Sequence, residues 1–314
     1  MMTKVLFTHD YGEEKFNLIK AMGYEIVHQR EDTEFNEEEL KGIEVLVCYN
    51  PFKNLDISKL DNLKLIQLSS TGTDQIPLNK LNKNTVVSNN KGGYSIPIGE
   101  WIVMSILNLM KNTYKLFRQQ ENKKWKMNKG CLEVYGKKVG FLGTGTLAQE
   151  GAKRLQGFGA EIIGFNTNGR IVDNMDLCYP LEEAHKVIGK CDIVICTLPY
   201  TEKTHELINN DFISKMKDGV FFINVSRGMI INEKDLIKNL KNGKIKGAAL
   251  DVFYEEPLPA ENELWNLENV IISPHNSWLS EMRNERRFEG IIENLRRYKE
   301  GLEVINKVDM KEGY

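Results

Sequence analysis

The stretch Lys137–Ala148 constrains this chain most, because it reads as a buried strand that runs into a glycine turn and then a helix. Gly143 allows the tight turn, Gly145 lets a pyrophosphate approach the backbone, and Ala148 lets the helix pack closely on the strand. The helix N-terminus would then face the phosphates. A second strand at 160–165 completes a strand-helix-strand unit of roughly thirty residues, which is typical of dinucleotide binding.

The bulk composition excludes several classes of protein. The chain has 314 residues, 41% of them apolar, and a net charge of −2. No apolar run approaches the ~18 residues of a membrane span, and the N-terminus turns polar too early for a signal peptide. Segment 111–129 carries seven basic residues against one acidic residue, and a solvated surface is its favoured interpretation. We therefore expect a cytoplasmic protein that binds neither membrane nor nucleic acid, and the scattered cysteines predict no metal site.

Strand-like and helical segments alternate along the whole chain. Short β-branched runs occur before residue 95, and about six near-continuous apolar runs follow from 139 to 272. This alternation predicts an α/β protein with two Rossmann-like, doubly wound parallel-sheet domains. Pro97 opens a helix that is apolar nearly all round, and a last long helix runs to about residue 299.

Three polar residues follow predicted strands at the end where open α/β sheets bind ligands. Arg227 can grip a carboxylate bidentately, Glu256 lies in an acidic loop, and His275 is one of five histidines. Taken singly, each is more often a surface or packing residue. Together, a cation, a carboxylate and an imidazole supply an anchor, an orienting group and a proton donor.

Five motifs resemble the D-isomer-specific 2-hydroxyacid dehydrogenases, in the short form of the glyoxylate/hydroxypyruvate reductases or phosphoglycerate dehydrogenases. In order, they lie at 143–148, 198–204, 224–228, 249–258 and 273–275. The resemblance implies that Arg227, Glu256 and His275 are the family's catalytic triad. A chain that ends at Tyr314 has no room for the regulatory domain of the long phosphoglycerate dehydrogenases, so we expect the short form.

The resemblance also implies a discontinuous substrate domain. Residues 1–96 and 284–314 would form it, and residues 97–283 would form the dinucleotide-binding domain inserted between them. The substrate would be held by Arg227, Asn50, Ser70, Thr71 and Gly72, although on its own residues the 70–72 stretch is equally a plain turn. The residues expected at the cofactor are Gly143, Gly145, Thr146, Leu147, Asn166, Thr167, Arg170, Thr197, Leu198, Pro199, Thr204, Val225, Ser226, Arg227, Asp251 and His275.

Asn166 bears on the choice of cofactor, because NAD-dependent members usually carry an aspartate there to hold the ribose hydroxyl. A neutral Asn166, followed by Thr167 and Arg170, tolerates the 2′-phosphate of NADP and slightly favours NADP over NAD. The opposing interpretation is that Asn166 binds the ribose of NAD while Arg170 is solvent-exposed or stacked on adenine.

The predicted function is reversible hydride transfer between a nicotinamide and C2 of a small 2-oxo acid, giving a D-2-hydroxy acid, with His275 as general acid and base. The resemblance further implies a homodimer. Two alternatives remain: a dinucleotide-sensing regulator without significant turnover, and a dehydrogenase of formate or phosphite on the same fold.

Overall fold

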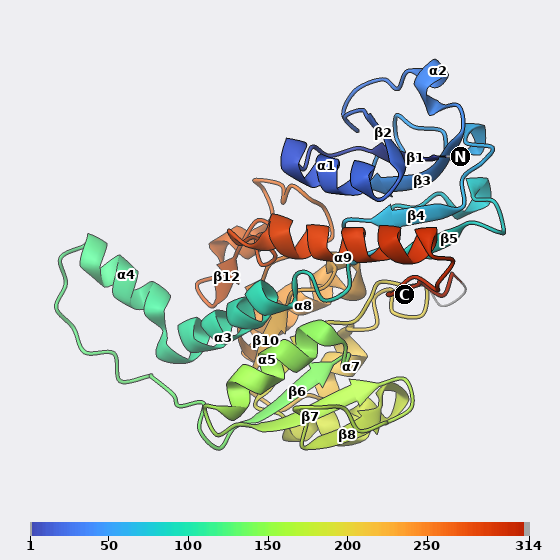
Figure 1. Cartoon of the computed structure of the whole chain (residues 1–314). Coiled ribbons are helices and arrows are strands. Elements are labelled where there is room, and N and C mark those ends of the chain that lie inside the picture. Colours follow the sequence, from blue (N-terminus) through green and yellow to red (C-terminus); the bar gives the residue numbers. More distant parts are fainter. Residues whose placement is uncertain (1, 311–314) are drawn as a thin grey trace. The chain divides into compact units, whose positions relative to one another are not determined.

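The computed structural model describes residues 2–310, and the chain divides into two compact units (Figure 1). The first unit contains the residues up to Tyr94 together with those from Ser280 onward, and the second contains Ser95–Leu279. Both boundaries lie a few residues before the positions expected from the sequence.

The first unit is built on a five-stranded parallel sheet in the order β2-β1-β3-β4-β5. Because the chain places β2 on one side of β1 and β3 on the other, the connections diverge at the carboxyl ends of β1 and β3. The strands are β1 (Thr3–Phe7), β2 (Tyr24–His28), β3 (Ile43–Cys48), β4 (Leu65–Leu68) and β5 (Val86–Ser88). The helices are α1 (Glu13–Ala21), α2 (Glu37–Leu40) and α9 (Arg283–Lys299), with short 3₁₀ turns at Ile57–Lys59 and Leu78–Lys80.

The C-terminal helix α9 belongs to this first sheet although it follows the second unit in the chain. Its apolar residues Phe288, Ile291 and Leu295 pack in one cluster with Val5 and Phe7 of β1. The buried Asn294 amide donates to Gln67 Oε1 at 2.6 Å and to Ser88 Oγ at 2.8 Å. The first unit is therefore built from two stretches that lie far apart in the chain.

The second unit holds seven parallel strands in the order β12-β11-β10-β9-β6-β7-β8. They are β6 (Lys138–Leu142), β7 (Glu161–Asn166), β8 (Leu177–Pro180), β9 (Ile193–Cys196), β10 (Val220–Asn224), β11 (Ile245–Leu250) and β12 (Val270–Ile272). The sequence indicated about six strands and missed β8. This edge strand is only partly buried, so it lacks the continuous apolar run that marks the central strands.

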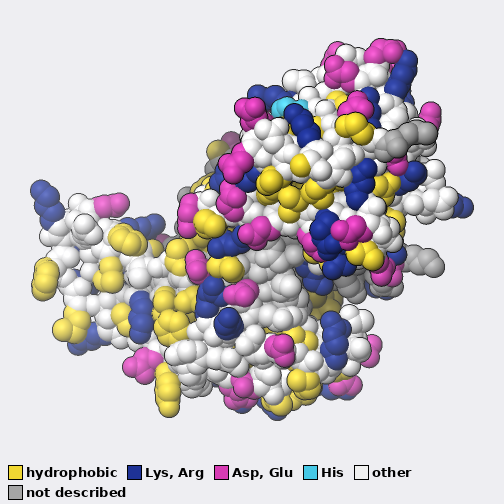
Figure 2. Space-filling view, in the orientation of Figure 1, with side chains coloured by type: hydrophobic (Ala, Val, Ile, Leu, Met, Phe, Trp, Pro, Cys, Tyr) yellow, Lys and Arg dark blue, Asp and Glu magenta, His cyan; other side chains and the backbone are white. Residues whose placement is uncertain are grey.

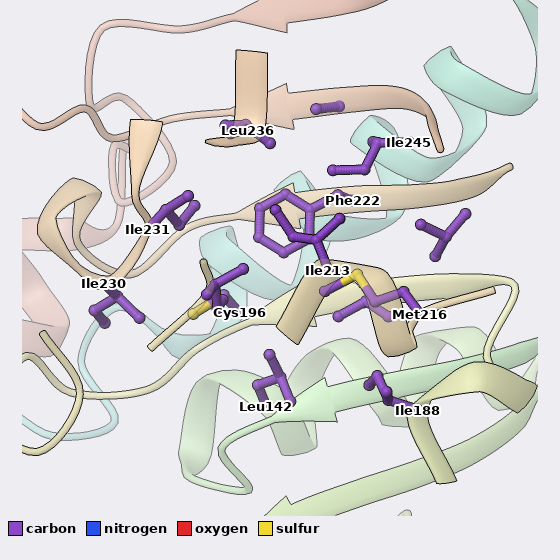
Figure 3. Close-up of a cluster of buried hydrophobic side chains, with 14 of the residues drawn as sticks. Leu142, Ile188, Cys196, Ile213, Met216, Phe222, Ile230, Ile231, Leu236 and Ile245 are labelled. Atoms are coloured by element: carbon purple, nitrogen blue, oxygen red, sulfur yellow. The ribbon is translucent and has the colours of Figure 1, made fainter. Parts of the chain in front are cut away.

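Helices cover both faces of the second sheet and close its core. They are α3 (Ser95–Lys111), α4 (Thr113–Glu121), α5 (Thr146–Gln156), α6 (Ala184–Val187), α7 (Asn210–Lys215) and α8 (Glu233–Lys241), with 3₁₀ turns at Leu181–Glu183, Ile188–Lys190, Gly228–Ile230 and Glu263–Asn266. Figure 3 shows one core cluster, in which Leu142, Cys196 and Phe222 of three strands meet Ile213 and Leu236 of two helices. On the other side, α3 approaches α5 so closely that a Cβ on Gly99 would lie 3.0 Å from the Glu150 backbone.

The α4 helix and the chain after it stand away from the rest of the second unit (Figure 1). This arm, which we define as residues 113–131, was not predicted from the sequence. Figure 2 shows hydrophobic side chains exposed along it, and those of Phe117, Trp125 and Met127 are largely in solvent. Among the described helices, none is both long enough and apolar enough to cross a membrane.

Candidate active site

The predicted cofactor turn lies where the connections of the second sheet diverge, between β6 and β9. Gly143 has φ +93°, and a Cβ there would lie 3.0 Å from Thr197 Oγ1, so both conformation and space require glycine. Gly145 caps the N-terminus of α5, and apart from its neighbours in the chain no atom of the described residues lies within 4 Å of where its Cβ would be. Thr146 and Leu147 form the first helical turn. This open, amide-lined helix start fits the phosphates of a dinucleotide.

The segment after β7 folds into a compact loop closed by Asn166. Its side chain is only 6% exposed; Nδ2 donates to the Arg170 carbonyl at 2.8 Å, and Oδ1 accepts from the Asn168 amide at 3.3 Å. Thr167 and Arg170 are exposed at the surface of this loop. Asn166 therefore shapes the loop internally, which the sequence did not indicate.

The loop after β9 carries the predicted Thr197, Leu198, Pro199 and Thr204. The Thr197 hydroxyl donates to the carbonyls of Leu142 and Gly143, both at 3.1 Å, and so links β9 to the glycine turn. The buried Thr204 hydroxyl donates to the Pro199 carbonyl at 2.8 Å and closes the loop. Of the four residues, Thr197 therefore contacts the glycine turn directly, while Thr204 fixes the shape of the loop that follows.

The segment after β10 is held by Asn224, a functional residue that sequence reasoning missed. Its Oδ1 accepts from the Ser226 amide and hydroxyl, at 3.0 and 2.7 Å, and its Nδ2 donates to the Arg227 carbonyl at 3.1 Å. Val225 and Ser226 are buried beside it. A Cβ on Gly228 would fall 1.9 Å from the Phe253 carbonyl carbon, so the backbone after Arg227 presses on the segment that leads to Glu256. The signal available in the sequence was a polar residue at the end of a fully buried strand.

Glu256 and His275 lie together, as predicted, in loops that follow β11 and β12. His275 Nδ1 is 2.9 Å from Glu256 Oε2, while Glu256 Oε1 accepts from the Phe253 amide at 3.0 Å. Burial acts to raise the pKa of Glu256, but the hydrogen bonds from His275 and Phe253 and the charge of Arg227 outweigh it, so this pKa lies below its ordinary value. Glu256 is thus an ionised acceptor that orients the imidazole through Nδ1, and Nε2 of His275 has no partner among residues 2–310.

Asp251 fastens the loop that bears His275. Its carboxylate is 1% exposed and accepts from Ser273 Oγ at 2.6 Å, from the Asn276 amide at 2.8 Å and from the Ser277 amide at 3.0 Å. Its carbonyl accepts from the His275 amide at 2.9 Å. The sequence placed Asp251 at the cofactor, whereas its carboxylate contacts in this structure hold the loop that bears His275.

In the first unit, the predicted carboxylate loop follows β4. The Ser70 hydroxyl donates to the Gly72 carbonyl at 2.9 Å, and Asn89 Nδ2 donates to the Thr71 carbonyl at 2.8 Å. The amides of Thr71 and Gly72 have no acceptor in the described part of the chain, so both can bind an external anion. Asn50, after β3, is exposed, and its backbone N–H donates to Glu31 Oε2 at 3.0 Å.

Residues 103–277 match the family model described as D-isomer specific 2-hydroxyacid dehydrogenase, NAD binding domain, and this match spans more than half of the chain. The chain belongs to the D-isomer-specific 2-hydroxyacid dehydrogenase family. It is therefore an NAD(P)-dependent oxidoreductase of 2-oxo and 2-hydroxy acids, and the predicted class of enzyme, cofactor and fold is confirmed.

Three proteins with named activities or known structures are similar to this chain. A glyoxylate reductase from Thermofilum pendens is 32% identical over 292 residues, which cover 87% of this dehydrogenase and 84% of the relative. A D-3-phosphoglycerate dehydrogenase from Methanocaldococcus jannaschii is 30% identical over 98% of this chain, which spans 60% of that relative. A family member from Xanthobacter autotrophicus Py2, solved with NADPH and MES, superposes with a TM-score of 0.86 over 100% of both chains at 25% identity.

Proposed function

We propose that this dehydrogenase reduces a short 2-oxo acid to the D-2-hydroxy acid, with Arg227, Glu256 and His275 acting on the substrate. The observation that carries this proposal is the 2.9 Å contact between His275 Nδ1 and Glu256 Oε2. It leaves Nε2 of the imidazole as the group that can donate a proton. The names of the relatives, which include glyoxylate and hydroxypyruvate reductases, support a short substrate.

A bound nicotinamide dinucleotide supplies or accepts the hydride at C2 of the substrate. His275 Nε2 would protonate the carbonyl oxygen as that carbon is reduced, and would take the proton back in the reverse direction. Ionised Glu256 accepts from Nδ1, fixes the ring and stabilises the imidazolium. Asp251 keeps His275 in place by binding the amides that follow it.

Substrate anchoring would use two sources of hydrogen bonds. The guanidinium of Arg227 suits a carboxylate because it can donate two parallel bonds. The amides of Thr71 and Gly72, which have no acceptor within residues 2–310, supply further donors of the kind that carboxylates bind. Asn50 would lie near the substrate chain.

The cofactor would be held by the Gly143–Leu147 turn and by the loops after β7, β9 and β10. We propose NADP as the preferred form, because the end of β7 offers no carboxylate to repel a 2′-phosphate. The exposed Arg170 guanidinium makes no ion pair in the described chain and can therefore bind a 2′-phosphate. The NADPH complex of the Xanthobacter relative supports this preference.

We further propose a cytoplasmic homodimer. The arm exposes Phe117, Trp125 and Met127, and the groove between α3 and α5 is lined by Val103, Met104, Leu107 and Phe158. Apolar surface on this scale is costly to leave in water and suits contact with a second copy. The family resemblance supports the same arrangement, which places the cofactor domains at the dimer contact.

The test is a substrate panel followed at the nicotinamide absorbance, with glyoxylate, hydroxypyruvate and pyruvate for reduction and formate and phosphite for oxidation. We expect turnover of at least one 2-oxo acid and none of formate or phosphite. Tight dinucleotide binding without turnover of any 2-oxo acid would overturn the proposal in favour of a sensing role. Oxidation of formate or phosphite alone would overturn it in favour of that chemistry.

A further inference from the structure

The first unit contains a buried arginine that lacks an acidic partner. Arg287, in the second turn of α9, is 9% exposed. Its Nε and Nη2 donate to Tyr94 Oη at 2.9 and 2.7 Å, and Tyr94 donates to the Ser69 carbonyl at 2.5 Å. No carboxylate within residues 2–310 lies at ion-pair distance from this guanidinium. Most of its five N–H groups therefore have no acceptor among the described residues.

Three further side-chain atoms of this unit are buried and make no hydrogen bond within residues 2–310. They are Tyr11 Oη, Ser69 Oγ and Asn90 Nδ2. The Tyr11 hydroxyl lies beside the guanidinium but makes no hydrogen bond of ordinary geometry with it. The Asn90 amide packs against Gly93 and against Gly290, three residues beyond Arg287 in α9.

Leaving such a group of atoms unsatisfied is expensive. A buried charge without a counter-charge is unfavourable, and each buried polar group that makes no hydrogen bond adds a further desolvation cost. Neighbouring groups do not supply the missing negative charge. Glu31 is bound by the Thr8 hydroxyl and the amides of Tyr49 and Asn50. An anion from outside the chain would complete the cluster.

The cluster lies at the end of the sheet where ligands bind. Tyr11 follows β1, Ser69 follows β4 and Asn90 follows β5, so all three stand at the carboxyl edge. Burial, and after it the charge of Arg287, lower the pKa of His9, whose ring is 5.0 Å from that of Tyr11. The lowered pKa disfavours a charge on His9, so Arg287 supplies the positive charge of the cluster.

We propose that Arg287, Tyr11 and Ser69 bind the distal carboxylate of a dicarboxylic 2-oxo acid. This inference rests on the proposed function and specifies its substrate class. Ser69 directly precedes the Ser70–Gly72 loop, which would hold the carboxylate next to the reacting carbon. Ser69 and the Ser70–Gly72 loop both follow β4, so both groups of donors lie at one edge of the sheet, as a short dicarboxylate requires.

The test compares kcat/KM for pairs of 2-oxo acids of equal chain length, with and without the distal charge: oxaloacetate against 2-oxobutyrate, and 2-oxoglutarate against 2-oxopentanoate. We expect the wild type to prefer the dicarboxylate in at least one pair. Arg287→Met should reduce this preference by about tenfold or more, since a charge-assisted contact is lost. Arg296→Met, which alters an exposed arginine of the same helix, should leave the preference unchanged.

Tyr11→Phe is a second test variant, which keeps the proposal testable if Arg287→Met fails to fold. The hydroxyl makes no hydrogen bond of ordinary geometry within residues 2–310, so its removal should destabilise the free protein little, yet it should reduce the dicarboxylate preference by roughly threefold or more. A wild type that treats both members of each pair alike would overturn the proposal. So would a preference that neither variant changes.

Thermal unfolding of the cofactor-free protein separates this proposal from the proposed function. Succinate should raise Tm more than butyrate in the wild type, and the difference should shrink in both variants, whether or not any 2-oxo acid is reduced. Stabilisation by inorganic phosphate but not by succinate would reveal a site for free anions and overturn the dicarboxylate assignment. Loss of turnover with a retained succinate effect would count against the proposed reaction alone.

Discussion

His275 illustrates how much a single residue depends on its surroundings. Its φ of +52° lies in the left-handed region, which is unfavourable for most side chains. The Asp251 carbonyl accepts its amide proton, and the Asp251 carboxylate binds the two following amides. The Trp278 indole donates to its carbonyl at 2.8 Å. Its ring is therefore aimed by backbone constraints as well as by Glu256.

His275→Asn should lower kcat for 2-oxo acid reduction by at least ~10²-fold, because general acid catalysis commonly contributes 10²–10⁴. Asparagine tolerates positive φ, so the loop should keep its shape while the proton donor is lost. Steady-state kinetics and dinucleotide titration measure the two effects separately. Near-normal turnover, or loss of dinucleotide binding, would contradict this role.

Glu256→Gln should change the pH dependence of the reaction. Glu256 is ionised near neutral pH because its pKa is lowered, so the variant removes a negative charge that stabilises the imidazolium. The pH above which kcat/KM for reduction falls should therefore move down. A pH profile identical to that of the wild type would remove Glu256 from the mechanism.

The lowered pKa of Glu256 also predicts how its contribution to the free energy of unfolding changes with pH. The stabilisation by Glu256 is present above the ordinary carboxyl pKa and is lost as pH falls through the lowered value. Urea unfolding of wild type and Glu256→Gln should therefore differ at pH 7 and converge in acid.

The loop after β7 determines, on the scale of an element, which dinucleotide fits. The Asn166 side chain makes its hydrogen bonds within this loop. The exposed Arg170 is therefore the residue that can distinguish NADP from NAD by the charge of the 2′-phosphate. An aspartate at position 166 would add a carboxylate where a 2′-phosphate is expected. Cofactor choice is therefore a property of the loop as a unit.

Arg170→Ala should lower kcat/KM for NADPH by about tenfold, as expected for a lost charge-assisted hydrogen bond, and should change that for NADH little. Asn166→Asp should reverse the order of the two cofactors by charge repulsion. Lys190→Ala, at an exposed site on another turn, is the matched control. A clear NADH preference that Arg170→Ala does not alter would contradict the NADP assignment.

The arm is relevant to the oligomeric state of the molecule, because its side chains have little to pack against within the second unit. Trp125 is fully exposed and Phe117 is 63% exposed. Hydrophobic residues so gathered on one projecting segment are typical of an interface.

Sedimentation at micromolar concentration should therefore find a dimer in the wild type. Phe117→Glu combined with Trp125→Glu should shift it toward monomer, because two charges would be buried at the contact. Trp265→Glu, at an exposed tryptophan outside the arm, should leave the dimer intact. A monomeric wild type would contradict the proposal.

The sequence by itself determined the fold class and the family. The glycine turn after β6 and the doubly buried runs of β9, β10 and β11 are local patterns, set by sterics and by burial on both faces. The edge strand β8 and the arm carry no such pattern and were not foreseen.

Only the tertiary structure decided how separate segments meet. The pairing of Glu256 with His275 was expected, but the grip of Asp251 on residues 276 and 277 and the internal use of Asn166 were not. Nor could the sequence reveal that Arg287 lies beside Tyr94 and Tyr11 without an acid. Such contacts join residues far apart in the chain, and their partners are fixed by packing of the sheet and helices rather than by local preference.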